Sequence, residues 1–173
     1  MTALRFLGAA LIVAACTGLG LEKAGRLRAR TAALTAVLTV LTLLRGEIAE
    51  RRTPMPEIAE RLAREAPEPC RGWFRRLEED MGRLEDGGFA GVWRRSLEET
   101  TSLPLGKAER ESLCLLGLSL GRFDAPEQAA AIDRCIRETE EFRRQAAETA
   151  QAQGRLFAGL GIAGGLLLAI VLL

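Results

Sequence analysis

The two ends of this chain are apolar, and the part between them is rich in charge. Residues 6–21 and 156–173 contain no charged side chain. At about 1.5 Å of rise per residue, these runs predict helices of roughly 24 and 27 Å, close to the roughly 30 Å hydrocarbon core of a bilayer. We therefore predict transmembrane helices at 1–21 and 156–173. The domain between them, 22–155, would be anchored twice to one membrane face.

Within that domain, apolar residues recur at intervals of three and four, the spacing of one face of a helix. The first stripe continues to about Arg52, so one long helix is predicted to leave the membrane. Thr53 can cap the next helix, because Pro54 and Pro56 fit a first turn whose N–H groups lack partners anyway. Proline and glycine positions divide the remainder into helices near 53–66, 73–86, 89–100 and 107–123, with a loop at 101–106.

A capping box predicts the start of the last helix. The Asp124 carboxylate can accept from the N–H of Glu127, and the Glu127 side chain can reach back to the N–H of the cap. No glycine or proline follows until residue 154, and the apolar stripe continues with a near-heptad period. No segment alternates with a period of two. We predict an all-α helical bundle, in which two long antiparallel helices are continuous with the N- and C-terminal transmembrane spans.

Charge predicts the orientation of the chain. Four basic residues between positions 23 and 30 follow the first run, with only Glu22 opposing them, and three arginines between 143 and 155 precede the second. Basic residues beside a span are retained in the cytoplasm. We therefore expect a two-pass protein of the cell membrane whose middle domain is cytoplasmic and whose termini face outward.

A lipoprotein signal is a competing interpretation of the N-terminus. Val13, Ala14 and Ala15 precede Cys16, which resembles a lipoprotein cleavage box. The apolar run, however, continues beyond this cysteine, and export would carry the basic cluster across the membrane. The uncleaved span is the interpretation we adopt, and whether Cys16 is lipidated stays open.

Composition argues against several classes of function. The sequence contains no His, so the usual general base and the commonest metal ligand are both absent. The net charge is +1, from 24 basic and 23 acidic residues, which provides no field for nucleic acid. The 4 cysteines form no CxxC pair. No phosphate-binding glycine motif is present. We predict no cofactor, no metal and no enzymatic activity.

The one motif of catalytic type is a GxSxG pattern from Gly117 to Gly121, centred on Ser119. A hydrolase elbow of this kind needs a preceding strand and a histidine, and this chain predicts neither. Two glycines four residues apart instead leave one helix face bare, so that another helix can approach closely. We assign Gly117 and Gly121 to packing, and Asp124 and Glu127 to capping.

Two further features are ascribed to packing. Trp93, like Trp73, lies at helical spacing among apolar neighbours, which favours the core over a binding surface. Gly161 and Gly165 form a GxxxG pair in the second apolar run, a pattern that lets transmembrane helices associate within the chain or between copies. A homo-oligomer is therefore possible, although the pattern identifies no partner.

Several of these residues, in order, resemble the stage III sporulation protein AB family. They are Glu47-Ile48 followed by Thr53-Pro54-Met55, Trp93 with Leu97, and Leu116-Gly117-x-x-Leu120-Gly121-x-x-Asp124-x-x-x-Gln128 between two terminal spans. The resemblance covers nearly the whole chain. No single short motif in it is specific, but the ordered set is.

The resemblance implies a function that the spacing of apolar residues alone does not indicate. Members of this family act in the channel complex between mother cell and forespore, in the mother-cell membrane around the forespore. Their helical domain is similar to that of the platform protein of type II secretion and type IV pilus systems. The implied role is a non-catalytic platform required for endospore formation. The implied partners are membrane lipid, a cytoplasmic ATPase (stage III sporulation protein AA) and other membrane components of the channel.

Two other classes of function remain as alternatives. A membrane-anchored signalling or sensing protein could use the near-heptad stripe to transmit motion between helices. An enzyme acting within the bilayer is disfavoured, because uncharged spans and the lack of His leave it no evident acid, base or ligand.

Overall fold

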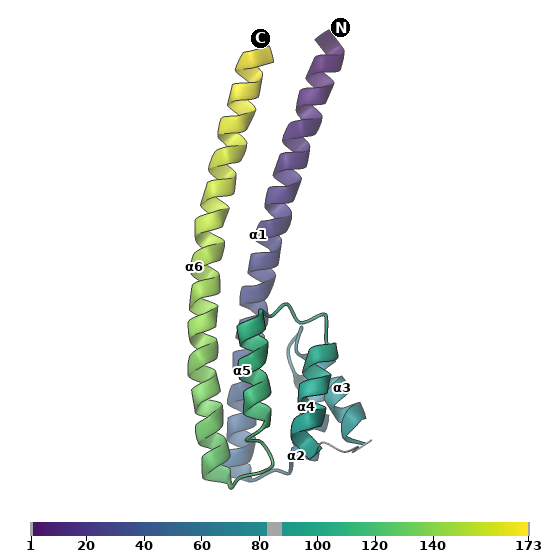
Figure 1. Cartoon of the computed structure of the whole chain (residues 1–173), viewed down its shortest axis with the longest axis vertical. Helices are drawn as coiled ribbons and strands as arrows, with labels where there is room; N and C mark the ends of the chain where they lie inside the picture. Colours follow the sequence, from purple (N-terminus) through teal and green to yellow (C-terminus); the bar gives the residue numbers. More distant parts are fainter. Residues whose placement is uncertain (1, 83–87, 173) are drawn as a thin grey trace. The chain divides into compact units, whose positions relative to one another are not determined.

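The computed structural model describes the backbone of residues 2–82 and 88–172, and side chains for residue 22 and residues 25–82 and 88–153. The described residues form six α-helices and a short π-helical segment, and they contain no strand. The predicted all-α class is confirmed. Figure 1 shows the elements: α1 (Thr2–Gly46), the π-helical turn (Glu47–Arg51), α2 (Met55–Glu65), α3 (Arg71–Met81), α4 (Gly88–Glu99), α5 (Lys107–Gly117) and α6 (Ala125–Leu172).

The chain divides into two compact units, one formed by residues 30–144 and the other by residues 1–29 with 145–173. We describe the first, which contains nearly all of the described side chains. The predicted transmembrane segments lie outside the residues whose side chains are described. Their membrane placement therefore stays a prediction.

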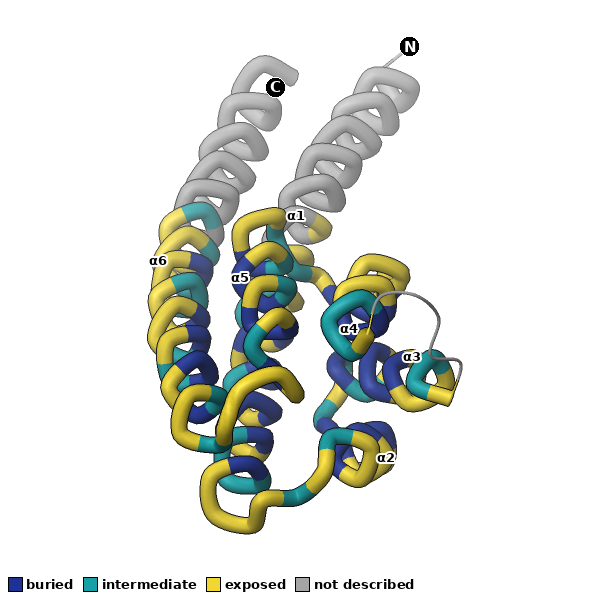
Figure 2. Tube along the Cα trace, turned by 60° about the horizontal axis from the view of Figure 1, so that its bottom comes forward, coloured by how far each residue is buried: buried dark blue, intermediate teal, exposed yellow. Residues whose placement is uncertain are grey.

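Within unit 30–144, α1, α5 and α6 lie side by side, and α1 and α6 run in opposite directions (Figure 1). The Arg45 guanidinium donates to the Asp133 carboxylate at 2.6 Å, which links α1 to α6. Ser112 of α5 donates to Glu138 of α6 at 2.6 Å. The predicted antiparallel pairing of the two long helices is therefore found within this unit. The buried faces of the helices turn toward a shared interior (Figure 2).

The centre of the core is aromatic. Trp73, Phe74 and Trp93 are each at most 1% exposed, and the two indole rings meet edge to face with centroids 4.7 Å apart. Buried indole N–H groups need acceptors. That of Trp73 donates to the Ser96 hydroxyl at 3.1 Å, and that of Trp93 donates to the Leu113 carbonyl at 2.7 Å. These bonds join α3, α4 and α5 around one cluster.

Gly117 lies directly under the Trp93 ring. A Cβ placed at Gly117 would stand 2.2 Å from Cδ1 of Trp93, closer than any real contact. The bare helix face predicted from the sequence is therefore occupied, and its occupant is an indole from α4. Gly121 differs, because it lies outside the helix with φ of +72°, a conformation that disfavours a side chain.

The fifth helix is shorter than predicted, and it ends at Gly117 rather than near 123. After Gly117 the N–H groups of Leu118 and Ser119 donate to the carbonyls three residues back, which tightens the turn. Gly121 then reverses the chain. Leu120 remains buried at 2% exposure, whereas Phe123, the last residue of the predicted helix, is 46% exposed.

The predicted cap at Thr53 is wrong. The residue at the N-cap position of α2 is Pro54, and the Thr53 hydroxyl donates instead to the Glu47 carboxylate at 2.8 Å. The reason is the π-helical end of the first helix and the left-handed Arg52, at φ of 54°, which together bring Thr53 back over Glu47.

The capping interaction at α6 is found in part. The Glu127 N–H donates to the Asp124 carboxylate at 3.4 Å, as predicted. The structure records no return bond from Glu127. Instead Gln128 holds the turn, since its amide oxygen accepts from the Gly121 N–H at 3.1 Å and its amide nitrogen donates to the Phe123 carbonyl at 2.6 Å.

At the start of α5 a glutamate side chain accepts from the N–H of the N-cap residue, an interaction that was not predicted there. The Glu109 side chain, 1% exposed, accepts from the Gly106 N–H and from the Arg30 guanidinium of α1, at 2.5 and 2.9 Å for the two arginine nitrogens. Arg110 donates to the carbonyls of Leu97, Thr100 and Leu103 and so orders the 101–106 loop.

Replacing Gly117 with Ala is expected to destabilise the fold by about 1–3 kcal/mol, because the new methyl group must displace the Trp93 ring. Denaturant unfolding of the full chain in detergent, followed by tryptophan fluorescence, measures this change. Gly91→Ala is the matched control, since nothing lies within 4 Å of its added Cβ. Gly91→Ala should be neutral or slightly stabilising. Equal unfolding midpoints for the two variants would contradict the packing described here.

Replacing Glu109 with Gln is expected to lower the free energy of unfolding by about 1–3 kcal/mol, because a buried carboxylate with charged and backbone donors is lost. Unfolding of the full chain under the same conditions measures it. The exposed Glu111→Gln of the same helix is the control. If both variants unfolded alike, the Arg30–Glu109 contact would contribute no stability.

Candidate functional site

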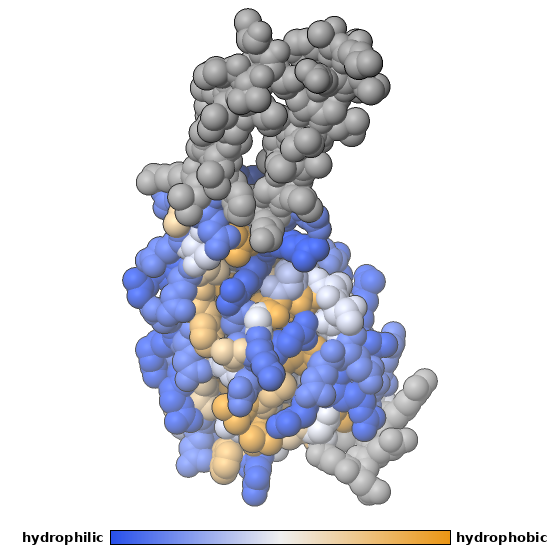
Figure 3. All heavy atoms as spheres, turned by 45° about the horizontal axis from the view of Figure 1, so that its top comes forward, coloured by the Kyte–Doolittle hydropathy of each residue, from blue (hydrophilic) through white to orange (hydrophobic). Residues whose placement is uncertain are grey.

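An exposed apolar surface lies at the C-terminal end of α5 and in the turn that follows. We call it the α5 patch, and it consists of Leu115, Leu118 and Phe123, which are 57%, 45% and 46% exposed. Leu43 of α1, 46% exposed, is the remaining large apolar side chain of comparable exposure among the described residues. On the face drawn in Figure 3, apolar side chains form a band between hydrophilic ones. Solvated clusters of this kind commonly mark interaction sites.

Phe123, one residue of the α5 patch, lines a groove between the turn and α6. Ser112, one turn before Leu115 on α5, donates to Glu138 of α6, so this side of α5 faces α6. Further along, the groove opens where the turn departs from α6. Its lining is Ser119, Phe123, Glu127, Ala130, Asp133, Arg134 and Arg137.

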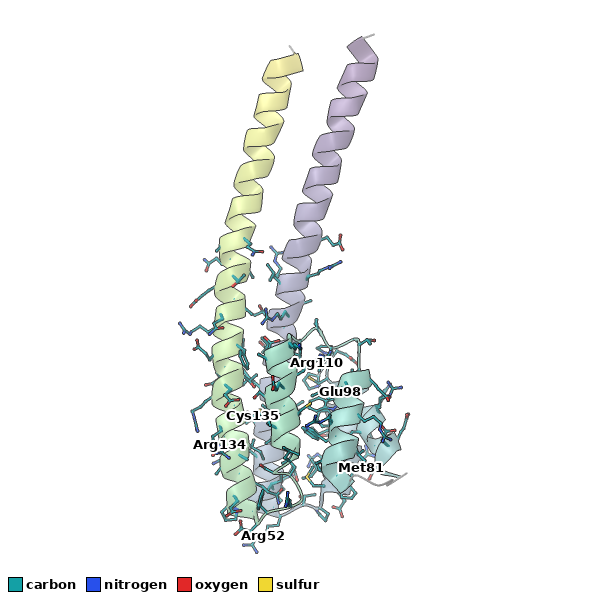
Figure 4. All side chains as sticks on the ribbon, in the orientation of Figure 1. Arg52, Met81, Glu98, Arg110, Arg134 and Cys135 are labelled. Carbon is teal, nitrogen blue, oxygen red and sulfur yellow. The ribbon has the colours of Figure 1, made fainter. Side chains whose placement is uncertain are left out.

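Three arginines without ion pairs among the described residues lie in the groove or beside Phe123. Arg134 and Arg137 line the groove, and Figure 4 labels Arg134 on α6. The Arg122 guanidinium lies 5.8 Å from the centroid of the Phe123 ring, within the range of a cation–π contact. In the described part of the chain none of the three has a carboxylate partner within 4 Å, whereas Arg45, Arg61 and Arg64, for example, are all paired.

The lining holds as many carboxylates as arginines, and the carboxylates are partly engaged. Asp133 is bound by Arg45, and Glu138, beside the groove, accepts from Ser112. Glu127 is the remaining carboxylate in the lining. The lining is therefore balanced in charge by number, but outside the Arg45–Asp133 pair its arginines outnumber its carboxylates, and Phe123 forms its apolar side.

A second groove lies at the end of the unit where the first helix finishes. It is lined by Ile48, Arg52, Thr53, Pro54, Met55, Gly121, Asp124, Ala125, Pro126 and Gln128. Both residues 53–56 and the 101–106 loop interrupt the predicted helices, and from the sequence we expect them to form one docking tip far from the membrane. In the structure they lie at opposite ends of this unit. Figure 4 shows Arg52 at one end and Arg110, which binds the loop at Leu103, toward the other.

The predicted site residues thus occupy different places. Trp93 and Gly117 are buried against each other, while Gly121 and Asp124 line the second groove and Glu127 lines the first. Gly161 and Gly165 of α6 lie outside the residues whose side chains are described. Sequence reasoning did not identify the α5 patch, because it assigned Phe123 to the buried stripe of a helix continuing to residue 123 and made no assignment for Leu115 and Leu118.

The described cysteines offer little reactivity. Burial raises the pKa of the Cys70 thiol to about 12 and raises the pKa of Cys135 as well. Cys114 is partly exposed, and burial also raises its pKa above the ordinary value. Thiols with raised pKa values carry little thiolate at neutral pH. No group of three or more potential metal ligands occurs among the described residues.

Among the described residues, one helix, Gly25–Arg51, is long and apolar enough to cross a membrane by length and composition. Almost half of its most apolar window is buried inside the protein. Residues 33, 34, 37, 40, 41 and 44 of this helix belong to the core of unit 30–144. Its apolar character in that region is therefore accounted for by the core of the bundle.

Comparison with known proteins gives a consistent result. The family model of stage III sporulation protein AB matches residues 5–173. The chain is 27% identical over 171 residues to stage III sporulation protein AB of Bacillus subtilis (strain 168), covering 98% of this chain and 99% of that protein. A solved structure of a stage III sporulation protein AB superposes with a TM-score of 0.64, at 22% identity, covering 71% of this chain and 97% of the solved one.

The solved structure supports the helical fold, and the family match extends over nearly the entire sequence. The resemblance inferred from the ordered residues between Glu47 and Gln128 is therefore confirmed. This chain belongs to the stage III sporulation protein AB family, and its role is in sporulation.

Proposed function

We propose that this protein is a non-catalytic membrane platform of the mother cell–forespore channel complex, which docks a cytoplasmic ATPase, stage III sporulation protein AA, to membrane components of the channel. The observation that carries the proposal is the α5 patch with its unpaired arginines. It combines exposed apolar side chains with arginines that have no ion pair among the described residues. A docking element needs such a surface.

The proposal includes a membrane arrangement. Residues 1–21 and 156–173 span the mother-cell membrane around the forespore, and residues 22–155 lie in the cytoplasm. The support is the absence of charge from both terminal runs and the basic residues that flank them on the inner side. In this arrangement the α5 patch is exposed to the cytoplasm, where an ATPase could reach it.

The platform function is tested by co-purification. The full chain, expressed in membranes together with the ATPase, should retain the ATPase through solubilisation in mild detergent. A chain with residues 31–155 deleted should be inserted but should retain none. The contrary result is a folded full chain that fails to retain folded ATPase in the same membranes, and it would count against the docking role.

The topology is tested by the native thiol of Cys114. In a Cys16→Ala background, a membrane-impermeant maleimide should leave intact protoplasts unlabelled and should label the protein after permeabilisation. The burial-raised pKa of Cys114 means that its thiolate fraction grows as pH rises, so labelling should accelerate between neutral and alkaline pH. Adding Cys114→Ser should remove most of the signal, since Cys70 and Cys135 are buried. Labelling of intact protoplasts would reverse the proposed orientation.

A further inference from the structure

We propose that the α5 patch and its groove bind an acidic amphipathic helix of a partner protein, with apolar side chains on Leu115, Leu118 and Phe123 and carboxylates on Arg122, Arg134 and Arg137. This inference rests on the proposed platform function, because it specifies the chemistry of the docked partner. The juxtaposition of half-exposed apolar side chains with unpaired cations on neighbouring elements points to that chemistry.

The apolar part of the surface matches the spacing of a helix. Leu115 and Leu118 are three residues apart at the end of α5, and Phe123 follows on the far side of the turn beside α6. An amphipathic helix presents apolar side chains at intervals of three and four, and it inserts them into a groove of this kind. Its backbone hydrogen bonds are already made internally, so the apolar patch need not supply polar partners.

The charges of the arginines beside the groove indicate which kind of partner would bind there. Among the described residues Arg134, Arg137 and Arg122 have no carboxylate partner, and the Arg122 guanidinium lies over the Phe123 ring. Carboxylates that flank an apolar stripe would satisfy these guanidinium groups and would steer association. A second copy of the chain is disfavoured as occupant, because a two-fold contact would bring the same three arginines together.

The proposed site is not needed to hold the fold. The three apolar side chains are about half exposed, whereas the residues that order the turn are Gly121 and Gln128, which bond to each other, and the buried Leu120. Variants of the α5 patch should therefore fold normally. This separation makes binding and stability distinguishable.

A first experiment uses a defined probe. A synthetic amphipathic peptide with leucines on one face and glutamates on both flanks is titrated against the full chain in nanodiscs, with fluorescence anisotropy as the readout. Leu118→Ser, and separately Arg134→Glu with Arg137→Glu, should each weaken binding about tenfold or more. The charge-reversed pair should instead bind a matched peptide in which lysines replace the glutamates. Binding of the acidic peptide should weaken as salt rises.

Matched controls lie elsewhere on the same unit. Leu43→Ser changes an apolar side chain of nearly the same exposure on α1, and Arg75→Glu reverses an exposed charge on α3. Neither should alter binding of the acidic peptide. Equal effects of the control and patch variants would overturn the proposal, as would equal binding of the acidic and basic peptides by the unmodified chain.

A second experiment separates this inference from the platform function. The ATPase is co-purified with the full chain carrying each α5 patch variant. Loss of the ATPase with the patch variants alone supports both proposals. Retention by all variants overturns the patch as docking site and leaves the platform function standing. If the unmodified chain retains no ATPase but binds the acidic peptide with the expected charge dependence, the platform function fails and the α5 patch stands as a site for another acidic helix.

Two further outcomes would overturn the assignment to a protein helix. A photo-crosslinking residue at position 118 that yields a covalent homodimer would identify a second copy as the occupant. Patch-dependent binding to vesicles of phosphatidylglycerol, with no binding of the acidic peptide, would identify an anionic membrane surface instead.

Discussion

The fold depends on the packing of the Trp93 indole ring against the Gly117 backbone. Trp93 of α4 covers Gly117 at the end of α5 and donates its N–H to the carbonyl of Leu113, so packing and hydrogen bonding fix the same pair of helices. The Trp73 ring meets the Trp93 ring edge to face and brings in α3. Any side chain at Gly117 would separate α4 from α5. The turn that begins immediately after Gly117 is thereby held at a defined place beside α6.

The exposed surface follows from that turn. Had α5 continued to residue 123, Phe123 would have shared a helical stripe with Leu113, Leu116 and Leu120, which are buried. The chain instead reverses at Gly121, Gln128 fastens the reversal, and Phe123 emerges beside the groove. The turn after Gly117 therefore both ends the packing of α5 against the core and exposes Phe123.

Charge is distributed unevenly over the described surface. Most arginines near helix ends and on α2 have carboxylates within reach, and Arg30 is joined to a buried glutamate. Exposed pairs of this kind contribute little stability but neutralise the surface. The arginines around the α5 patch are left without such partners. What distinguishes the groove is the combination of these arginines with the exposed Phe123 beside them.

The sequence by itself determined the helical class, the family and most helix boundaries, because apolar spacing, proline and glycine act locally and the ordered motif needs no coordinates. Trp93 could be assigned to the core from its neighbours alone. Only the tertiary structure decided where α5 ends. An apolar residue in a continuing helix and an apolar residue beyond its end have the same local sequence pattern, so the pattern alone does not tell which one is buried. The tertiary structure also decided the acceptor of Thr53, the partner of Glu109 and the separation of the 53–56 segment from the 101–106 loop. Each of these depends on residues brought together by packing across distances in sequence that no local pattern records.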